Sequence, residues 1–272
     1  YDIKQNEDGT LADYKRTDSE TVADGYTRMY AYCLCAECCG WNNGGADLDR
    51  MNVNAVKKFL DITFDAYYKA VGKDFEKEIP SMFTDEPNTG MKRRLKTPFD
   101  RTTDVSMPWT LDLAETFKKT YGFDILDYLP EISYDLPDGK PSYARYAYFD
   151  HTTERFVEAF GDYYADYCEK YGIKMTGHIL YEDSLSSQAF AVGECMRFYR
   201  KMQWPGIDML VDCRDYTTAK QTQSIVHQYG KEAMVSELYG VTGWECRFMD
   251  YKSQGDWQAA YGVTVRVPHL AW

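Results

Sequence analysis

Short apolar runs alternate with amphipathic segments along most of this chain. The runs predict six strands, at Met29–Cys35, Ile79–Thr84, Gly172–His178, Gly206–Leu210, Ala233–Glu237 and Val263–Val267. Helical periodicity predicts helices over about 53–71, 113–121, 143–171, 217–229 and 247–261. Strands separated by helices are typical of parallel βαβ units, since a parallel pair needs a long crossover. The sequence therefore predicts an α/β fold whose six strands pair in parallel and in chain order.

Polar residues end most of these strands. Glu86, His178, Glu237 and His269 each follow or finish an apolar run, and Asp208 lies inside the fourth one. Neither G-x-G-x-x-G nor a phosphate-binding G-x4-G-K-[ST] loop occurs, so a nucleotide-binding doubly wound sheet has no support. Chemical groups at the carboxyl ends of parallel strands are typical of a (β/α)8 TIM barrel. We therefore expect a TIM barrel.

Only part of such a barrel is visible in the sequence. A complete barrel has eight strands, and the chain ends at Trp272, soon after its last predicted strand. We expect about six of the eight βα units, with the first two missing. Residues 1–24 then form a polar lead-in or a loop of a preceding unit, and 25–272 a partial barrel. Further domains of the same parent chain are expected.

Composition excludes two classes of partner. The net charge of −12 leaves no basic stripe to neutralise phosphates, which argues against nucleic acid. No run of 18 apolar residues is present, so no membrane span is expected. The 24 Tyr and 6 Trp combine apolar faces with polar edges, which suits carbohydrate surfaces.

The cysteine pattern is ambiguous. Cys33, Cys35, Cys38 and Cys39 form C-x-C-x2-C-C, and four more cysteines follow far downstream. A zinc site usually needs two C-x2-C pairs, and the second pair is missing. Alternation on a strand would place Cys33 and Cys35 too far apart for a disulfide. We therefore expect these four thiols to be reduced and to bind no metal.

Two acidic motifs carry the candidate chemistry. Phe83–Pro87 and Val235–Gly240 each bring a carboxylate to the end of an apolar strand. Two carboxyl groups facing one pocket can divide a reaction between a general acid and a general base. Glu86 is the expected acid, because Pro87, the apolar strand and the adjacent Asp85 would raise its pKa. Glu237 is then the expected base, although either residue could instead order a hydrogen-bond network.

The remaining candidate residues are expected to bind substrate. This set comprises Asp85, His178, Asp208, Tyr239, Trp244 and His269. His178 would donate to hydroxyl groups, and the aromatic faces after Glu237 would stack on a ring. Structural alternatives stay open, because a histidine is often satisfied by backbone, Asp208 can cap a loop and Trp244 can anchor one.

The order and spacing of the motifs resemble glycoside hydrolase family 106 from about residue 48 to the end. The motifs are Phe83–Pro87, Thr176-Gly177-His178, Pro205-Gly206-Ile207-Asp208, Ser236–Gly240, Gly243-Trp244, Asp250-Tyr251-Lys252, Gly255-Asp256-Trp257-Gln258 and Pro268-His269-Leu270. The resemblance implies an inverting, exo-acting glycosidase for α-L-rhamnosides or a related plant or pectic sugar. It also implies a calcium ion near the sugar, additional β-sandwich domains and a periplasmic or extracellular location in a bacterium. The cysteine cluster lies outside the family pattern.

Two other functions remain open at this point. One is a metal-dependent barrel hydrolase with His178, Asp208, Glu237 and His269 as ligands, since imidazole and carboxylates suit zinc or manganese. The other is a non-catalytic carbohydrate-binding barrel fragment, because a barrel without all its strands exposes edges.

Overall fold

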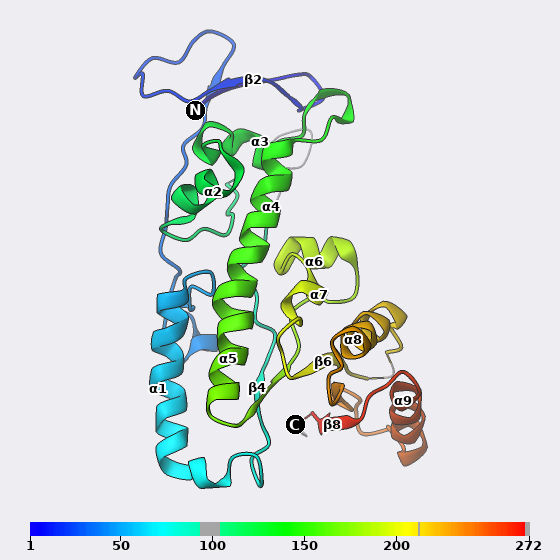
Figure 1. Ribbon diagram of the computed structural model, residues 1–272. Coiled ribbons are helices and arrows are strands. Elements are labelled where there is room, and N and C mark those ends of the chain that lie inside the picture. The colour runs from blue at the N-terminus through cyan, green and yellow to red at the C-terminus, as the bar shows by residue number, and fades with distance from the viewer. Residues whose placement is uncertain (93–103, 212, 270–272) are drawn as a thin grey trace. The chain divides into compact units, whose positions relative to one another are not determined.

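The chain forms two compact units that are interleaved in sequence. The computed structural model describes residues 1–92, 104–211 and 213–269 (Figure 1). The first unit contains residues 1–48 and 90–154, and the second contains residues 49–89 and 155–272. The sequence predicted a division at residue 24 instead, with one partial barrel behind a polar lead-in.

The first unit contains a small antiparallel sheet and a helical core. Its strands β1 (Asp2–Gln5), β2 (Leu11–Lys15) and β3 (Thr27–Arg28) pair in the order β2-β1-β3. Its helical elements are η1 (Gly40–Asn42), α2 (Leu113–Tyr121), η3 (Ile125–Asp127), α3 (Leu129–Ser133), η4 (Pro137–Gly139) and most of α4 (Tyr143–Phe156). Leu113 and Phe117 of α2 pack with Ile132, Ala147 and Tyr148 in a buried core. Residues 1–24, expected to be irregular, thus supply two strands of this unit.

The second unit contains the parallel sheet. Its strands β4 (Ser81–Thr84), β5 (Lys174–Gly177), β6 (Trp204–Met209), β7 (Val235–Leu238) and β8 (Val265–Pro268) are all parallel. They pair in chain order, β4-β5-β6-β7-β8, as the sequence predicted. The helical elements are α1 (Val53–Val71), η2 (Gly72–Asp74), the π-helical η5 (Val157–Asp162), α5 (Tyr163–Lys170), α6 (Leu185–Ala191), α7 (Cys195–Phe198), α8 (Tyr216–Tyr229) and α9 (Phe248–Ala260). This strand–helix alternation is that of successive βα units.

Helices of the second unit begin and pack as their sequences require. The Asn52 side chain accepts hydrogen bonds from the Asn54 and Ala55 amides and thereby caps α1. Val56, Leu60 and Phe64 of α1 are buried, and Phe64 meets Tyr164 of α5 edge to face with ring centroids 5.4 Å apart. Ile207 and Met209 of β6 pack with Ala219 of α8, and Val263 belongs to the same buried cluster. The helices therefore bury the apolar residues of the sheet.

The predicted strand Met29–Cys35 is wrong. Residues 29–35 have no strand structure, and β3 ends just before them in the other sheet. Tyr30, Tyr32 and Leu34 are 66%, 76% and 83% exposed, so the apolar alternation does not mark a buried face. Within this stretch, Met29 exchanges backbone hydrogen bonds with Tyr1, both of 2.8 Å, but the described residues 30–35 lie in no strand. The parallel sheet in the described residues therefore has five strands rather than six.

The cysteine cluster lies in this irregular stretch. All eight cysteines have free thiols, and Cys33, Cys35, Cys38 and Cys39 are exposed. The strand-based geometry that we used to argue against a disulfide does not apply, because no strand forms here. Absence of metal from the cluster stays a prediction.

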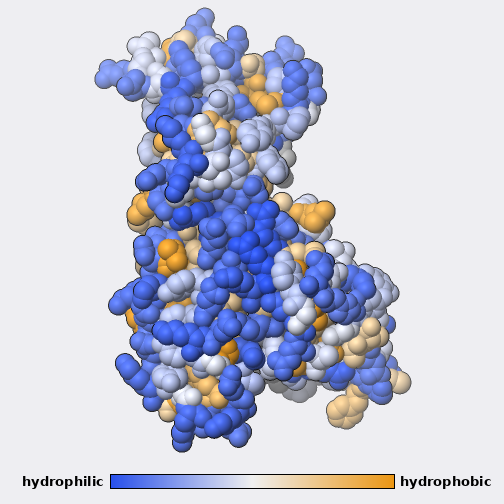
Figure 2. All heavy atoms as spheres, viewed as in Figure 1, coloured by the Kyte–Doolittle hydropathy of each residue, from blue (hydrophilic) through white to orange (hydrophobic). Residues whose placement is uncertain are grey.

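The face of the protein in Figure 2 is mainly polar. On the face in Figure 2, hydrophilic side chains predominate and hydrophobic ones form small separate groups, which agrees with a mean hydropathy of −0.56. Within the described residues, no helix combines the length and the apolar character that a membrane crossing requires.

Gly177 allows β4 and β5 to approach closely at their carboxyl ends. Its φ is +122°, and a Cβ at this position would lie 1.9 Å from the Thr84 carbonyl oxygen. Gly177→Ala should therefore lower the free energy of unfolding by at least ~3 kcal/mol in chemical denaturation. Gly230→Ala is the matched control, because Gly230 has φ +59° and open space around it; it should cost only ~1 kcal/mol. Equal losses would contradict the close-approach explanation.

Candidate active site

The carboxyl edge of the parallel sheet gathers most of the predicted site residues. Parallel strands end at one edge, and here the edge carries Asp85 and Glu86 after β4, His178 after β5, Asp208 in β6, Glu237 in β7 and His269 after β8. Asp208 and Glu237 lie directly opposite each other in the β6–β7 ladder. Their side chains therefore occupy the same face of the sheet.

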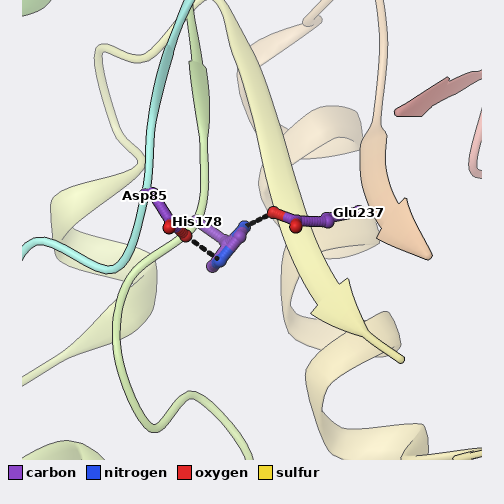
Figure 3. A group of neighbouring side chains, drawn as sticks. All are labelled: Asp85, His178 and Glu237. Carbon is purple, nitrogen blue, oxygen red and sulfur yellow. Dashed lines mark ion pairs between the residues drawn. The ribbon is translucent and has the colours of Figure 1, made fainter. Parts of the chain in front are cut away.

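His178 is the centre of this group. Its Nε2 lies 3.2 Å from Asp85 Oδ1 and 3.8 Å from Asp208 Oδ2. On the other side, its Nδ1 lies 3.9 Å from Glu237 Oε2 (Figure 3). The side chain is 1% exposed, and neither ring nitrogen has a well-aligned hydrogen bond among the described residues. The contacts of His178 with these carboxylates are therefore mainly electrostatic. The alternative considered from the sequence, that backbone groups satisfy the His178 ring by hydrogen bonds, does not hold.

The surrounding carboxylates hold His178 in its charged form. Burial alone would lower the pKa of this imidazole, but the Asp85 contact and the charges of Glu182 and Asp208 outweigh burial and raise the pKa to about 9. In return, the contact with His178 lowers the pKa of Asp85. His178 is thus an imidazolium at neutral pH, with Asp85 as an ionised partner.

Glu86 presents its carboxyl group from a strained turn. Its φ is 44°, in the left-handed region that residues other than glycine seldom adopt. Such strain often occurs at functional sites. Although Glu86 is exposed, partial desolvation raises the pKa of its carboxyl group, the His178 charge lowers it, and Asp85 and Asp208 raise it. Solvent limits the size of this effect, but its direction agrees with the expectation from the sequence.

The two carboxyl groups on β6 and β7 are also perturbed. Desolvation raises the pKa of Asp208, while the His178 charge lowers it and the Glu237 charge raises it. Desolvation likewise raises the pKa of Glu237, and both Asp85 and Glu86 contribute as like charges. The Glu86 charge therefore acts on the carboxyl group of Glu237, and perturbed pKa values of this kind are common at functional sites.

The other predicted side chains lie in different surroundings. His269 Nε2 is 3.9 Å from Glu237 Oε1, so His269 belongs to the edge cluster. Tyr239, at φ 72°, packs edge to face on Tyr251 of α9, and its hydroxyl lies against Gly255. Trp244 is fully exposed. The contacts named here for Tyr239 and Trp244 do not involve the charged residues around His178.

Sequence reasoning missed Glu182. This residue follows β5 in the loop before α6 and is 6% exposed. Burial raises its pKa to about 8, although His178, the Asp208 amide and the Tyr199 hydroxyl favour the ionised form. An acidic residue four positions after His178, behind the apolar pair Ile179-Leu180, was the available signal.

A comparison with protein-family models identifies the relationship. Residues 37–271 match the glycoside hydrolase 106 model, described as α-L-rhamnosidase. The chain belongs to this family. A comparison with curated proteins finds no match.

The fold of this family 106 chain is also found in a solved structure. A rhamnosidase from Novosphingobium sp. PP1Y matches 84% of the chain with a TM-score of 0.61 and 19% sequence identity. At that identity the similarity concerns the fold alone, and it agrees with a partial barrel. The family 106 chain spans 21% of the length of that rhamnosidase.

The edge cluster provides suitable ligands for cations. Asp85, His178 and Glu237 form one group whose ligand atoms lie within 4.8 Å of one another, and Glu86, His178 and Asp208 form another. Calcium prefers oxygen ligands, which the carboxylates supply and the His178 nitrogen does not. Asp208 Oδ1 is a buried oxygen without a hydrogen-bond partner. The carboxylate oxygens of Asp208 and Glu86 are therefore ligands of the kind that calcium prefers.

The raised pKa of His178 predicts a pH-dependent stability. A histidine whose pKa rises from 6.5 to about 9 on folding stabilises the fold fully below pH 6.5. That contribution is lost as the pH rises towards 9. The difference in unfolding free energy between the unaltered chain and His178→Gln should therefore shrink by roughly 3 kcal/mol over this interval. Denaturation at several pH values measures it. His227→Gln, on an exposed part of α8, is the control; a pH-independent difference for His178→Gln would refute the charge assignment.

Proposed function

We propose that this chain is the catalytic barrel segment of a longer exo-acting glycosidase that hydrolyses α-L-rhamnosides with inversion. Membership of family 106 supports the substrate class. The observation that supports the mechanism is that Glu86, which follows β4, and Glu237, in β7, each lie in a cluster with His178 at the same edge of the sheet. Glu86 acts as the general acid and Glu237 as the general base.

In this mechanism, the two carboxyl groups act on opposite sides of the scissile bond. Protonated Glu86 gives its proton to the glycosidic oxygen as the bond from C1 to that oxygen breaks. Ionised Glu237 takes a proton from water, whose oxygen forms the new bond to C1 from the opposite face. The products are an alcohol and a sugar with inverted configuration. Room for the water implies carboxyl groups ~6.5–9.5 Å apart, against ~5–5.5 Å for retention.

The charged neighbours support these roles. The imidazolium of His178, whose ring nitrogens are buried, moderates the negative charge of the surrounding carboxylates. Asp208 and His269 lie at the same edge, and we propose that they bind hydroxyl groups. We propose Asp85 as the partner that orients His178. Tyr239 and Trp244 are the weaker candidates for sugar contact.

Hydrolysis of aryl α-L-rhamnosides by the longer parent protein tests this function. We expect turnover with L-rhamnose as the released sugar. Binding of L-rhamnose without turnover would instead support the non-catalytic carbohydrate-binding alternative. Lack of both binding and turnover would reject the proposed substrate class.

A metal-dependent hydrolase is the second candidate. The group Asp85, His178 and Glu237 favours it, because its ligand atoms lie within 4.8 Å of one another and mixed nitrogen and oxygen ligands suit zinc or manganese. Elemental analysis of the purified parent protein distinguishes the candidates. Stoichiometric zinc or manganese whose removal abolishes turnover would support the second and contradict the two-carboxylate mechanism.

A further inference from the structure

Glu182 and Tyr199 connect the ends of β5 and β6 inside the protein. Glu182 Oε1 accepts a hydrogen bond from the Asp208 amide at 2.7 Å, and Glu182 Oε2 accepts one from the Tyr199 hydroxyl at 2.9 Å. The same hydroxyl accepts from the Ile179 amide at 3.1 Å. This side-chain pair therefore joins the residue after His178 to Asp208.

The sheet needs this connection because the β5–β6 ladder ends early. Its register stops at Gly177 and Pro205, whereas β6 stays paired with β7 as far as Met209. The Asp208 amide lies beyond the end of the β5 ladder, and a buried amide without an acceptor is costly. The Glu182 carboxylate takes the place of the missing strand and fixes the backbone that carries Asp208.

The backbone of Glu182 is itself held from two helices. Its carbonyl oxygen accepts from Gln188 Nε2 of α6 at 3.0 Å and from Gln221 Nε2 of α8 at 2.6 Å. Gln188 also accepts from the Cys195 amide at 3.0 Å through its Oε1. These bonds leave the Glu182 side chain little freedom, so it can define where β6 ends relative to β5.

We propose that Glu182, supported by Tyr199, is a positioning residue that holds Asp208 beside His178 for sugar binding. This inference rests on the proposed function, in which Asp208 binds the sugar. Glu182 does not contact the sugar, because it is buried and both carboxylate oxygens already have partners.

Kinetics of the parent protein test the proposal. Glu182→Met removes both acceptors, and Tyr199→Phe removes only the hydroxyl. Both should raise the KM for an aryl α-L-rhamnoside, Glu182→Met by at least ~10-fold and Tyr199→Phe by less, while kcat changes less than ~3-fold. If Glu182 acts through Asp208, Glu182→Met should add little to the effect of Asp208→Asn. Additive effects would overturn the positioning role.

The matched control is Glu194→Gln, since Glu194 is another acidic residue near α7 and its carboxylate pairs with Arg197 at the surface. This variant should keep the unaltered KM. Far-ultraviolet circular dichroism establishes that each variant is folded. If Glu182→Met does not fold, Tyr199→Phe decides the question: an unchanged KM would contradict the proposal.

Hydrogen exchange separates this proposal from the proposed function. The peptide 205–210 contains the Asp208 amide, which Glu182 holds. In Glu182→Met, exchange at this amide should accelerate by at least ~10-fold, whether or not the protein hydrolyses rhamnosides. Unchanged exchange would overturn the positioning role. Faster exchange in a protein that neither binds nor hydrolyses rhamnosides would reject the substrate class alone and retain the link between Glu182 and Asp208.

Discussion

Glu237→Gln in the parent protein should lower kcat for α-L-rhamnosides by at least ~10²-fold. The amide keeps the shape of the side chain but cannot take a proton from water, so attack on C1 loses its base. The loss should be similar for substrates with good and poor leaving groups, because water activation is needed for both. Steady-state kinetics with aryl rhamnosides of graded leaving-group pKa measure this.

The control for Glu237→Gln is Glu232→Gln, just before β7. Glu232 accepts from Trp204 Nε1 at 3.0 Å near the opposite, amino-terminal edge of the sheet. Its loss should leave kcat unchanged. Both variants should unfold within ~1 kcal/mol of the unaltered protein. Near-normal turnover by Glu237→Gln would remove Glu237 from the mechanism. Rescue by azide through a rhamnosyl azide of retained configuration would show a covalent intermediate, which the proposal excludes.

Glu86→Gln should also lower kcat by at least ~10²-fold, but only where the leaving group needs a proton. For an alkyl rhamnoside or a disaccharide, the departing oxygen is strongly basic, and loss of the acid should have its full effect. For a dinitrophenyl rhamnoside, the leaving group departs as a stable anion, and most of the activity should remain. This dependence distinguishes the acid from the base.

Glu78→Gln is the matched control for Glu86→Gln, because Glu78 is exposed and precedes β4 at its other end. It should not change kcat for either substrate. Equal losses on activated and unactivated substrates would show that Glu86 is not the acid. If the leaving-group dependence appeared in Glu237→Gln instead, the two roles would be reversed.

Periodicity predicted the regular parts of the second unit. The helix from residue 53, its Asn52 cap and the five strands from Ser81 onward agree with the structure, since local propensity and burial favour the same elements there. Parallel pairing then brings strand ends together, which is why His178, Asp208 and Glu237 could be placed at one edge from sequence alone.

Other features depend on contacts that the pattern does not reveal. Met29–Cys35 looked like a strand, but no described strand pairs with it. The hairpin of β1 and β2 had a usable signal in Asp8-Gly9, a common turn pair that we did not interpret. The importance of Glu182 depends on Tyr199 and on the Asp208 amide, both distant in sequence. Tyr239 adopts φ 72°, and its side chain packs on α9, which alternation along β7 could not predict.

The configuration of the first sugar released tests the central claim most directly. Proton NMR during hydrolysis of an α-L-rhamnoside by the parent protein follows the anomeric signals before mutarotation mixes them. Direct attack by water activated at Glu237 predicts that β-L-rhamnose appears first and the α anomer only later, as equilibrium is reached. Initial release of α-L-rhamnose would mean two successive inversions through a covalent intermediate. That result would contradict the assignment of Glu86 and Glu237 as the acid and base of a single displacement.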